Sequence, residues 1–334
     1  MTDDGTTTRA VRAGPPAGTA AGLDPAGPEP ARDHADRRRR GVTQQQRPLW
    51  LLAPGGVLMT LVILLPLLLA FYLALLDLDQ YTLRKWLDAP FIGVQNFVEA
   101  FQSGLLHSIW ISVSFAVLAT AVTVPIGVAA AVVTQNAYRG RAWVRAVFLI
   151  PYVLPSFVVA SVWRTMLQPD GIVNSLLAKG GIHGGLWLSG PRSYWTLILV
   201  EIWAAWPFIY LMALAGLQSV DGEVHEASAI DGARWWPKLS HVILPYLRGP
   251  VLLACLLATL NHINNFTLPF VLFGAPAPDD VNVMPMLVYV TSFQSLRFGL
   301  SAAMAIVSLV LVAVPLFAYL RAVRLDVHEE GGRK

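Results

Sequence analysis

The sequence carries little charge for its length. Only 13% of its 334 residues are Asp, Glu, Lys or Arg, whereas 55% are hydrophobic, and the mean hydropathy is +0.55. A soluble globular domain usually has about 25% charged residues. This shortage of charge excludes an ordinary soluble domain and predicts an integral membrane protein, so the long apolar runs decide the fold class.

Cysteine, phosphate-binding motifs and metal-ligand clusters are also scarce. Cys255 is the single cysteine, which excludes an intrachain disulfide, and its apolar neighbours predict a packed thiol. The sequence has no G-x-x-x-x-G-K-[ST] phosphate loop, so this chain is not expected to hydrolyse ATP. No metal-ligand spacing is present, and we predict no catalytic residue, no metal site and no cofactor bound by this chain.

The apolar runs predict six membrane spans, each long enough for a hydrocarbon core that needs roughly 20 helical residues. We expect them at residues 48–76, 104–138, 146–166, 193–217, 249–273 and 298–320. Residues 1–47 are rich in Gly, Pro and Ala and predict a disordered cytoplasmic tail. The membrane domain covers residues 48–325, and residues 326–334 form a second cytoplasmic tail. Residues 281–296 are too polar for a span and predict an outer-surface helix or a re-entrant segment.

Basic residues indicate the orientation of these spans. The net charge is only +3, and Lys and Arg gather at the ends of the apolar runs rather than along one face, which excludes a nucleic-acid partner. Arg37 to Arg40 precede the first run, Arg139, Arg141 and Arg145 follow the second, and Arg321 and Arg324 close the last. Because cytoplasmic loops are enriched in such residues, both termini are predicted to be cytoplasmic, with the arginines near anionic membrane lipid.

A polar, amphipathic stretch at residues 219–247 separates the fourth and fifth runs. Asp221 is a candidate N-cap, Val224, Ala227 and Ile230 fall on one stripe, and Gly232 ends or bends the helix. The stretch predicts two short helices that dock a cytoplasmic partner. A surface helix without a partner is the alternative.

Within this stretch, residues follow the pattern E-A-[AS], three residues, G, nine residues, [IV]-x-L-P. The pattern resembles the coupling loop of permease subunits in binding-protein-dependent ABC importers, and Asp231-Gly232-Ala233 is similar to their carbohydrate-uptake branch. Ser228 and Val242 depart conservatively from the Ala and Ile of the family. The resemblance implies that the ATPase is contacted through Glu226, Ala227, Ser228, Asp231, Gly232, Ala233, Leu244 and Pro245.

The same resemblance implies the architecture and the partners. It predicts a type I ABC importer permease fold with six transmembrane helices, in a bacterial inner membrane. The expected partners are a second, different permease subunit, two ABC ATPase subunits that hold ATP and Mg, and an extracytoplasmic solute-binding lipoprotein. ATP hydrolysis would then be confined to separate subunits.

Amide and imidazole groups crowd the fifth run. Asn261, His262, Asn264 and Asn265 lie within five residues, and burying them in hydrocarbon is costly unless they are paired or face a cavity. A continuous helix would place Asn261 and Asn265 on one face with His262 beside them and Asn264 turned away. We therefore predict a cavity-facing group, with hydrogen bonds between helices as the alternative.

Glu201 places a carboxylate inside the fourth run, together with Ala205 and Phe208 on the same helix face. A charge within a span is costly and marks a functional candidate. Glu201 could accept hydrogen bonds from sugar hydroxyls, neutralise a cationic solute, or pair with a basic residue of a partner subunit. Ala204 and Ala205 leave room for a ring or for a neighbouring helix.

Residues 151–156 read Pro-Tyr-Val-Leu-Pro-Ser and are similar to the maltose-type pattern P-Y-x-x-P-S. The resemblance implies a solute pathway lined by Tyr152, Ser156, Glu201, Ala204, Ala205, Phe208, His262 and Asn265, to which the polar pattern adds Asn261. Maltose-type permeases have amides at the positions of Glu201 and His262, so a solute other than maltose is expected.

The expected function is that of a permease subunit for a sugar or sugar-like solute. Three alternatives remain open from the sequence. The solute could be an amine, an amino sugar or a glycerophosphodiester. The chain could be the scaffolding half of a permease pair, with few solute contacts. A membrane enzyme would have only His262 with Glu201 as a reacting pair.

Overall fold

The computed structural model describes residues 54–219 and 244–331, with side chains described as far as residue 321. Within these ranges the secondary structure is helical, apart from one isolated bridge between Leu76 and Phe91. The predicted all-α class is therefore confirmed for the described part of the chain.

Five of the described helices are long and apolar enough to cross a membrane. They are Pro54–Leu73, which includes α2 (Leu65–Leu73), then α4 (Leu105–Thr134), α8 (Arg192–Gln218), α11 (Leu244–Ile263), and Phe298–Arg321 within α14 (Phe298–Gly331). The bent pair α5 (Arg141–Val153) and α6 (Ser156–Met166) supplies a sixth candidate. Each of the six predicted runs thus contains at least one helix, and α14 continues past the predicted end of the last run.

The third run is not the continuous span that was expected. Its helices α5 and α6 meet at 91°, with Leu154 and Pro155 in extended conformation between them. Proline disfavours helical geometry in the residue before it and cannot donate a backbone hydrogen bond itself. Pro155 therefore explains a sharp break at this position.

The fifth run is also broken, and the prediction of one helix from residue 249 to residue 273 is wrong. Helix α11 ends at Ile263, and α12 (Thr267–Phe273) begins after three residues. In a continuous helix the nitrogen of Pro269 would face the carbonyl of Asn265, where its ring clashes and no N–H is available. Breaking the helix before Thr267 puts Pro269 in the first turn of α12, where that N–H is not needed.

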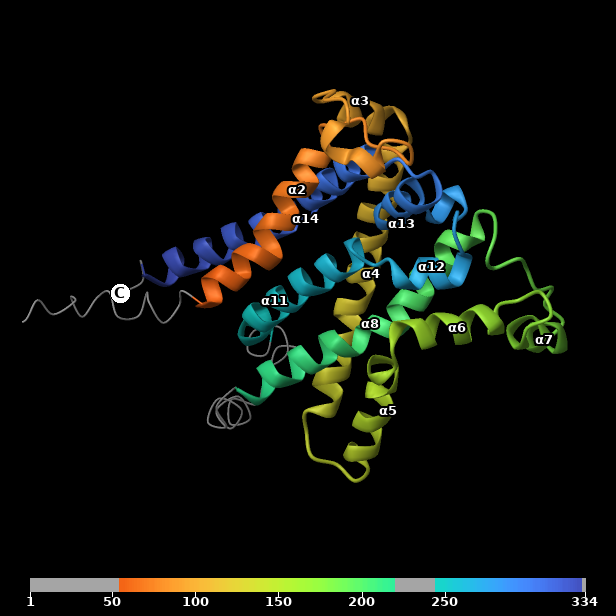
Figure 1. Cartoon of the computed structure of the whole chain (residues 1–334). Helices are drawn as coiled ribbons and strands as arrows, with labels where there is room; N and C mark the ends of the chain where they lie inside the picture. The colour runs from red at the N-terminus through yellow and green to blue at the C-terminus, as the bar shows by residue number, and fades with distance from the viewer. Residues whose placement is uncertain (1–53, 220–243, 332–334) are drawn as a thin grey trace, which may run out of the picture. The chain divides into compact units, whose positions relative to one another are not determined.

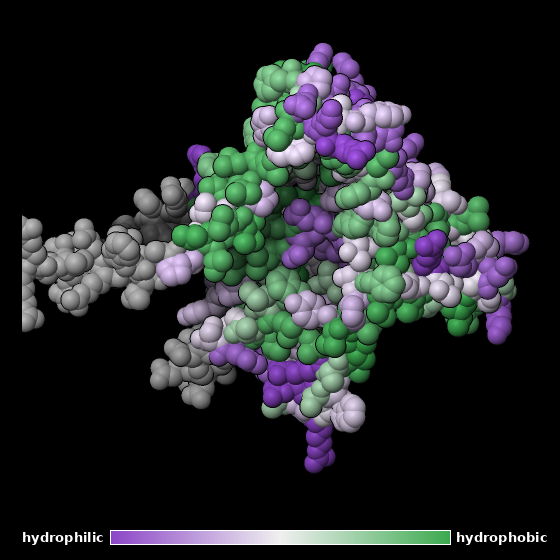
Figure 2. Space-filling view, in the orientation of Figure 1, coloured by the Kyte–Doolittle hydropathy of each residue, from purple (hydrophilic) through white to green (hydrophobic). Residues whose placement is uncertain are grey.

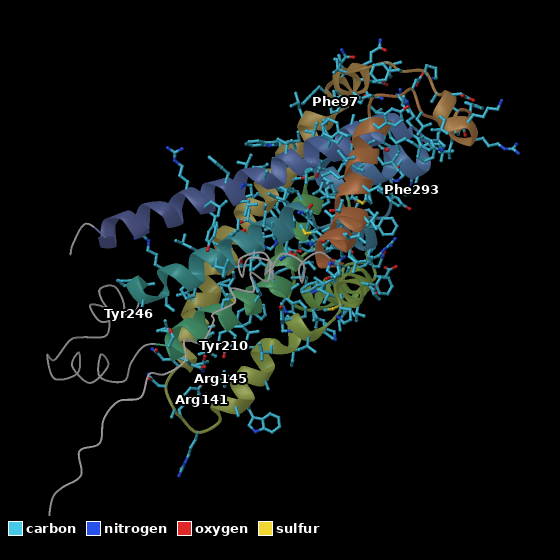
Figure 3. All side chains as sticks on the ribbon, turned by 60° about the vertical axis from the view of Figure 1, so that its left-hand side comes forward. Phe97, Arg141, Arg145, Tyr210, Tyr246 and Phe293 are labelled. Carbon is cyan, nitrogen blue, oxygen red and sulfur yellow. The ribbon has the colours of Figure 1, made fainter. Side chains whose placement is uncertain are left out.

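Shorter helices form the connections between the spans. They are η2 (Leu83–Asp88), α3 (Gln95–Gln102), α7 (Ile172–Lys179), η4 (Asp279–Val281), α13 (Met284–Tyr289) and η5 (Val290–Gln294). Segment α13–η5 lies where an outer-surface helix or re-entrant segment was predicted, and it is too short to count as a span. In Figure 3, Phe97 of α3 and Phe293 of η5 lie at one end of the bundle, whereas Arg141, Arg145 and Tyr210 lie toward the other.

Helices α4, α8 and α11 all contact one another and form the centre of the packing (Figure 1). A Cβ atom on Gly127 would lie 2.7 Å from the Cβ of Ile209, so a glycine is needed where α4 and α8 approach. Two side-chain hydrogen bonds add to this packing, Thr134 to Tyr210 (3.1 Å) and Thr120 to Thr259 (3.3 Å). The result is a firm α4–α8–α11 core beside the two helix breaks.

Candidate functional site

A cavity of about 470 Å³ lies where both helix breaks approach α8. Figure 2 shows hydrophilic residues in a hollow of the face viewed, between largely hydrophobic surfaces. All nine residues predicted for the solute pathway line this cavity: Tyr152, Ser156, Glu201, Ala204, Ala205, Phe208, Asn261, His262 and Asn265. They come from three separate helical runs, so packing has brought together what the sequence indicated one segment at a time. Their role toward a solute stays a prediction.

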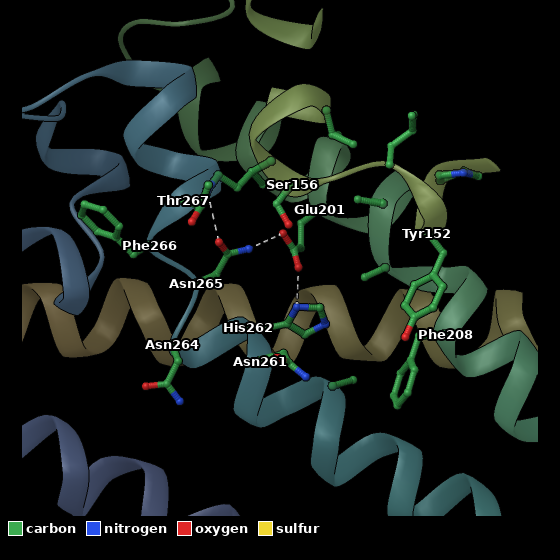
Figure 4. Close-up of a pocket in the computed structure, with 17 residues that line it drawn as sticks. Tyr152, Ser156, Glu201, Phe208, Asn261, His262, Asn264, Asn265, Phe266 and Thr267 are labelled. Carbon is green, nitrogen blue, oxygen red and sulfur yellow. Dashed lines mark hydrogen bonds and ion pairs between the residues drawn. The ribbon is translucent and has the colours of Figure 1, made fainter. Parts of the chain in front are cut away.

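Three polar side chains of the cavity wall form a hydrogen-bonded cluster (Figure 4). His262 Nδ1 lies 2.7 Å from Glu201 Oε1, and Asn265 Nδ2 donates to Glu201 Oε2, also at 2.7 Å. With Glu201 ionised, His262 would donate from Nδ1, because an ionised carboxylate only accepts hydrogen bonds. From the sequence, Glu201 could have paired with a basic residue of a partner subunit. The structure instead shows that it pairs with His262 and Asn265 of this chain.

Burial explains why this cluster is well paired. The Glu201 side chain is 9% exposed and that of His262 only 1%. A buried carboxylate is costly unless it is hydrogen-bonded, and bonds to an ionised group are shorter and stronger than neutral ones. The opposite nitrogen of the imidazole, Nε2, is buried without a hydrogen-bond partner among the described residues.

The amides of the fifth run do not share a helix face as expected. Asn261 belongs to α11, whereas Asn265 lies in the break, where its Oδ1 accepts a bond from the backbone N–H of Leu268 at 3.2 Å. Asn261 and Asn264 are exposed, and each donates to a carbonyl one turn earlier in its own segment. The helix argument failed because it assumed that the helix continued through residue 265.

Aromatic side chains form another part of the cavity wall. Tyr152 stacks on Phe208 with ring centroids 6.1 Å apart, and Tyr152 remains 49% exposed. The wall thus has an apolar surface on one side and hydrogen-bonding groups on the other, an arrangement typical of small-molecule sites.

Sequence reasoning missed part of the lining. The additional residues are Pro151, Leu154, Val159, Ala258, Asn264, Phe266, Thr267 and Leu268. Phe266 and Thr267 follow the break between α11 and α12, and Pro269 was the signal that could have located them. Asn264 had been placed away from the cavity by the assumption of a continuous helix.

Most of the predicted coupling residues lie outside the described part of the chain. This applies to Glu226, Ala227, Ser228, Asp231, Gly232 and Ala233, whereas Leu244 and Pro245 form the first residues of α11. Helices α8 and α11 are therefore the two elements that the predicted coupling loop connects. Among the residues described, no group of three or more His, Cys, Asp and Glu side chains could hold a metal ion.

A second carboxylate–base pair lies at the end of the bundle that carries α3. Arg297, just before α14, donates to both oxygens of Glu99 in α3, and the Nη2–Oε2 distance is 2.7 Å. These hydrogen bonds, and the positive charge of Arg297, keep the pKa of Glu99 below its usual value. The same bonds raise the pKa of Arg297.

A polar cavity at the breaks of discontinuous membrane helices is typical of transport proteins. Residues 123–324 match the family described as binding-protein-dependent transport system inner membrane component. The match covers more than half of the chain, which therefore belongs to this family. It is an inner-membrane component with several membrane-spanning helices.

Curated relatives and a solved structure agree with this membership. The chain is 27% identical over 240 residues to the trehalose/maltose transport system permease protein MalF of Thermococcus litoralis, covering 71% of this chain and 81% of that protein. It is 27% identical over 303 residues to the sulfoquinovosyl glycerol transport system permease protein SmoG of Agrobacterium fabrum, covering 85% and 96%. A chain of a bacterial ABC transporter involved in alginate import has a TM-score of 0.70 at 20% identity, covering 83% and 96%. This last likeness establishes the type I ABC importer permease fold.

Proposed function

We propose that this chain is one permease subunit of an ATP-driven importer and forms half of the pathway for a sugar or sugar-like solute. The main support for this proposal is the cavity at the two helix breaks, whose lining combines amide, hydroxyl and aromatic groups. A carbohydrate presents hydroxyl groups for hydrogen bonding and C–H faces for aromatic contact, so this lining suits it. The solutes after which MalF and SmoG are named support the same solute class.

We infer the partners from the family membership. A second, different permease subunit completes the pathway, an extracytoplasmic binding protein delivers the solute, and two ATPase subunits bind ATP and Mg. This chain binds no cofactor and performs no catalysis of its own. A solved bacterial alginate ABC transporter is in complex with a periplasmic protein that holds an alginate pentasaccharide, which supports the binding-protein partner.

Coupling to the ATPase runs through residues 219–247, which join α8 to α11. Movement of this loop tilts both helices, and both carry residues of the cavity wall. Replacing Gly232 with Leu should abolish solute uptake while membrane insertion stays normal, measured by uptake into cells and by membrane fractionation. Normal uptake by this variant would contradict the coupling role.

The function is tested by the ATPase activity of the complete complex in a lipid bilayer, with its binding protein and a panel of neutral sugars, amines, amino sugars and glycerophosphodiesters. Stimulation by a neutral sugar supports the proposal. If only amines, amino sugars or glycerophosphodiesters stimulate the ATPase, the chain still belongs to an importer, but the proposed sugar solute is wrong.

Two variants distinguish a solute pathway from a scaffolding subunit. Tyr152→Ala removes the exposed ring of the stacked pair and should raise the solute concentration needed for half-maximal stimulation about tenfold. Trp195→Ala removes an exposed ring of α8 that does not line the cavity and should leave that concentration unchanged. Equal behaviour of both variants would favour the scaffolding role.

A further inference from the structure

Glu201, His262 and Asn265 connect three elements at one point, and together they are named the clamp. Glu201 lies on α8, His262 lies in the last turn of α11, and Asn265 lies just before α12. One carboxylate oxygen therefore holds the end of α11, and the other holds the start of α12 (Figure 4). The Glu201 carboxylate thus bonds to residues on both sides of the break between α11 and α12.

The carboxylate has little exposed surface left for a solute. Each oxygen already accepts a bond of 2.7 Å, and 9% of the side chain is exposed. A cationic solute that displaced His262 or Asn265 from this small surface would leave that side chain without its buried partner. Because unpaired buried polar groups are costly, such an exchange is unfavourable.

Asn265 fixes the direction of the bonds. Its Nδ2 donates to Glu201, while its Oδ1 accepts from the N–H of Leu268 in the first turn of α12. Turning the amide over would break both bonds. The clamp consequently requires an acceptor at position 201 and a side chain at position 265 that also accepts from Leu268.

We propose that Glu201 is a positioning residue: it acts through His262 and Asn265 to hold the break between α11 and α12, and it does not bind solute charge. That Glu201 makes no direct contact with solute charge rests on the proposed function, whereas the clamp does not. Because α8 and α11 flank the predicted coupling loop, the clamp also connects the two helices that the loop would move.

The test exchanges the carboxylate and the amide. In Glu201→Gln, an amide nitrogen facing Asn265 Nδ2 creates a contact between two donors. The opposite orientation makes His262 Nδ1 the acceptor and moves the imidazole proton to the buried Nε2, which has no partner among the described residues. In the double variant Glu201→Gln with Asn265→Asp, the introduced glutamine accepts from His262 and donates to the introduced aspartate, which still accepts from Leu268. Asn265→Asp alone places two carboxylates against each other. The control pairs Glu201→Gln with Asn264→Asp, because within the described residues the Asn264 amide bonds only to the carbonyl of Leu260.

All variants are compared in the assembled complex in a bilayer, by thermal unfolding and by solute-stimulated ATPase activity. We expect Glu201→Gln and Asn265→Asp each to lower the stimulated activity about tenfold and to lower the unfolding temperature. The exchanged pair should recover most of the stimulated activity and most of the unfolding temperature. The control pair should recover neither quantity. No recovery in the exchanged pair, or equal recovery in the control, would overturn the clamp. If Glu201→Gln alone fails to assemble, assembly of the exchanged pair decides the matter in the same way.

The solute panel separates the clamp from the proposed function. We expect Glu201→Gln to reduce the response to every active solute by the same factor. Selective loss of the response to an amine would show that Glu201 binds solute charge and would overturn the proposal. If no sugar stimulates the complex but the exchanged pair recovers thermal stability, the proposed solute is wrong and the clamp stands.

Discussion

Two carboxylates in this protein hold a basic side chain from a distant part of the chain, and their surroundings differ sharply. Glu201 and His262 are 9% and 1% exposed in the wall of the cavity, whereas Glu99 and Arg297 are 39% and 43% exposed at the α3 end of the bundle. Glu201 divides its two oxygens between two donors, while Glu99 gives both of its oxygens to one guanidinium. Both carboxylates bond to a nitrogen-containing side chain, but their access to water differs.

This difference decides what each pair can contribute. At the α3 end, water replaces a lost partner, so the pair exchanges one set of hydrogen bonds for another and contributes little stability. In the cavity wall, a lost partner leaves the remaining groups buried and unpaired, and breaking the pair becomes expensive even if forming it gained little. The buried cluster therefore specifies geometry, and the exposed pair adds a small stabilisation.

Removing the buried carboxylate should have the largest effect. Glu201→Ala leaves His262 Nδ1 and Asn265 Nδ2 without their acceptor, and we expect the free energy of unfolding to fall by about 3 kcal/mol. Reversible unfolding of the purified chain in mixed micelles measures this. A loss no larger than that of the exposed pair would remove the contrast between the two sites.

A smaller effect is expected at the second donor of the cluster. Asn265→Ala removes one bond to Glu201 and one bond to the first turn of α12, and should cost about 1 kcal/mol of unfolding free energy. Asn264→Ala is the matched control, since that exposed amide bonds, in the described part of the chain, only to the preceding turn and should cost close to nothing. Similar losses in both variants would argue against a specific role for Asn265.

The exposed pair should respond weakly and should depend on salt. Glu99→Gln is expected to cost less than about 1 kcal/mol of unfolding free energy at low ionic strength. Salt screens exposed charges, so the difference from wild type should shrink as sodium chloride is added. A cost that is large and independent of salt would place this pair in the same class as the buried one.

The pH dependence gives the finest comparison. Arg297 lowers the pKa of Glu99 from its ordinary value of 4.5, so the ionised form is favoured in the folded state. The stability that ionised Glu99 contributes to the folded protein is fully present at a pH above its ordinary pKa. This contribution is lost as the pH falls through the lowered pKa that Glu99 has in the folded protein. Unfolding temperatures of wild type and Glu99→Gln should therefore differ at neutral pH and converge in acid. A difference that grows in acid would reverse the assigned sign.

Prolines show where sequence reasoning succeeded and where it failed. Pro125, Pro151, Pro207, Pro250 and Pro315 all lie inside helices, whereas breaks occur at Pro155 and before Pro269. Proline weakens a helix at every one of these positions, but neighbouring segments can satisfy the freed carbonyl. Whether a proline breaks its helix depends on the segments that pack around it. The sequence pattern does not show which segments these are.

The sequence alone determined the class of the protein, because low charge and long apolar runs leave a membrane helix as the stable form for each run. It also pointed to Glu201, His262 and Asn265, since polar groups in such runs are costly without a purpose. Only the tertiary structure decided that these groups bond to each other. Glu201 and His262 are 61 positions apart, and helix packing alone sets such a contact. A span's length and polarity are local properties, whereas the partner of a buried charge is a property of the assembled fold.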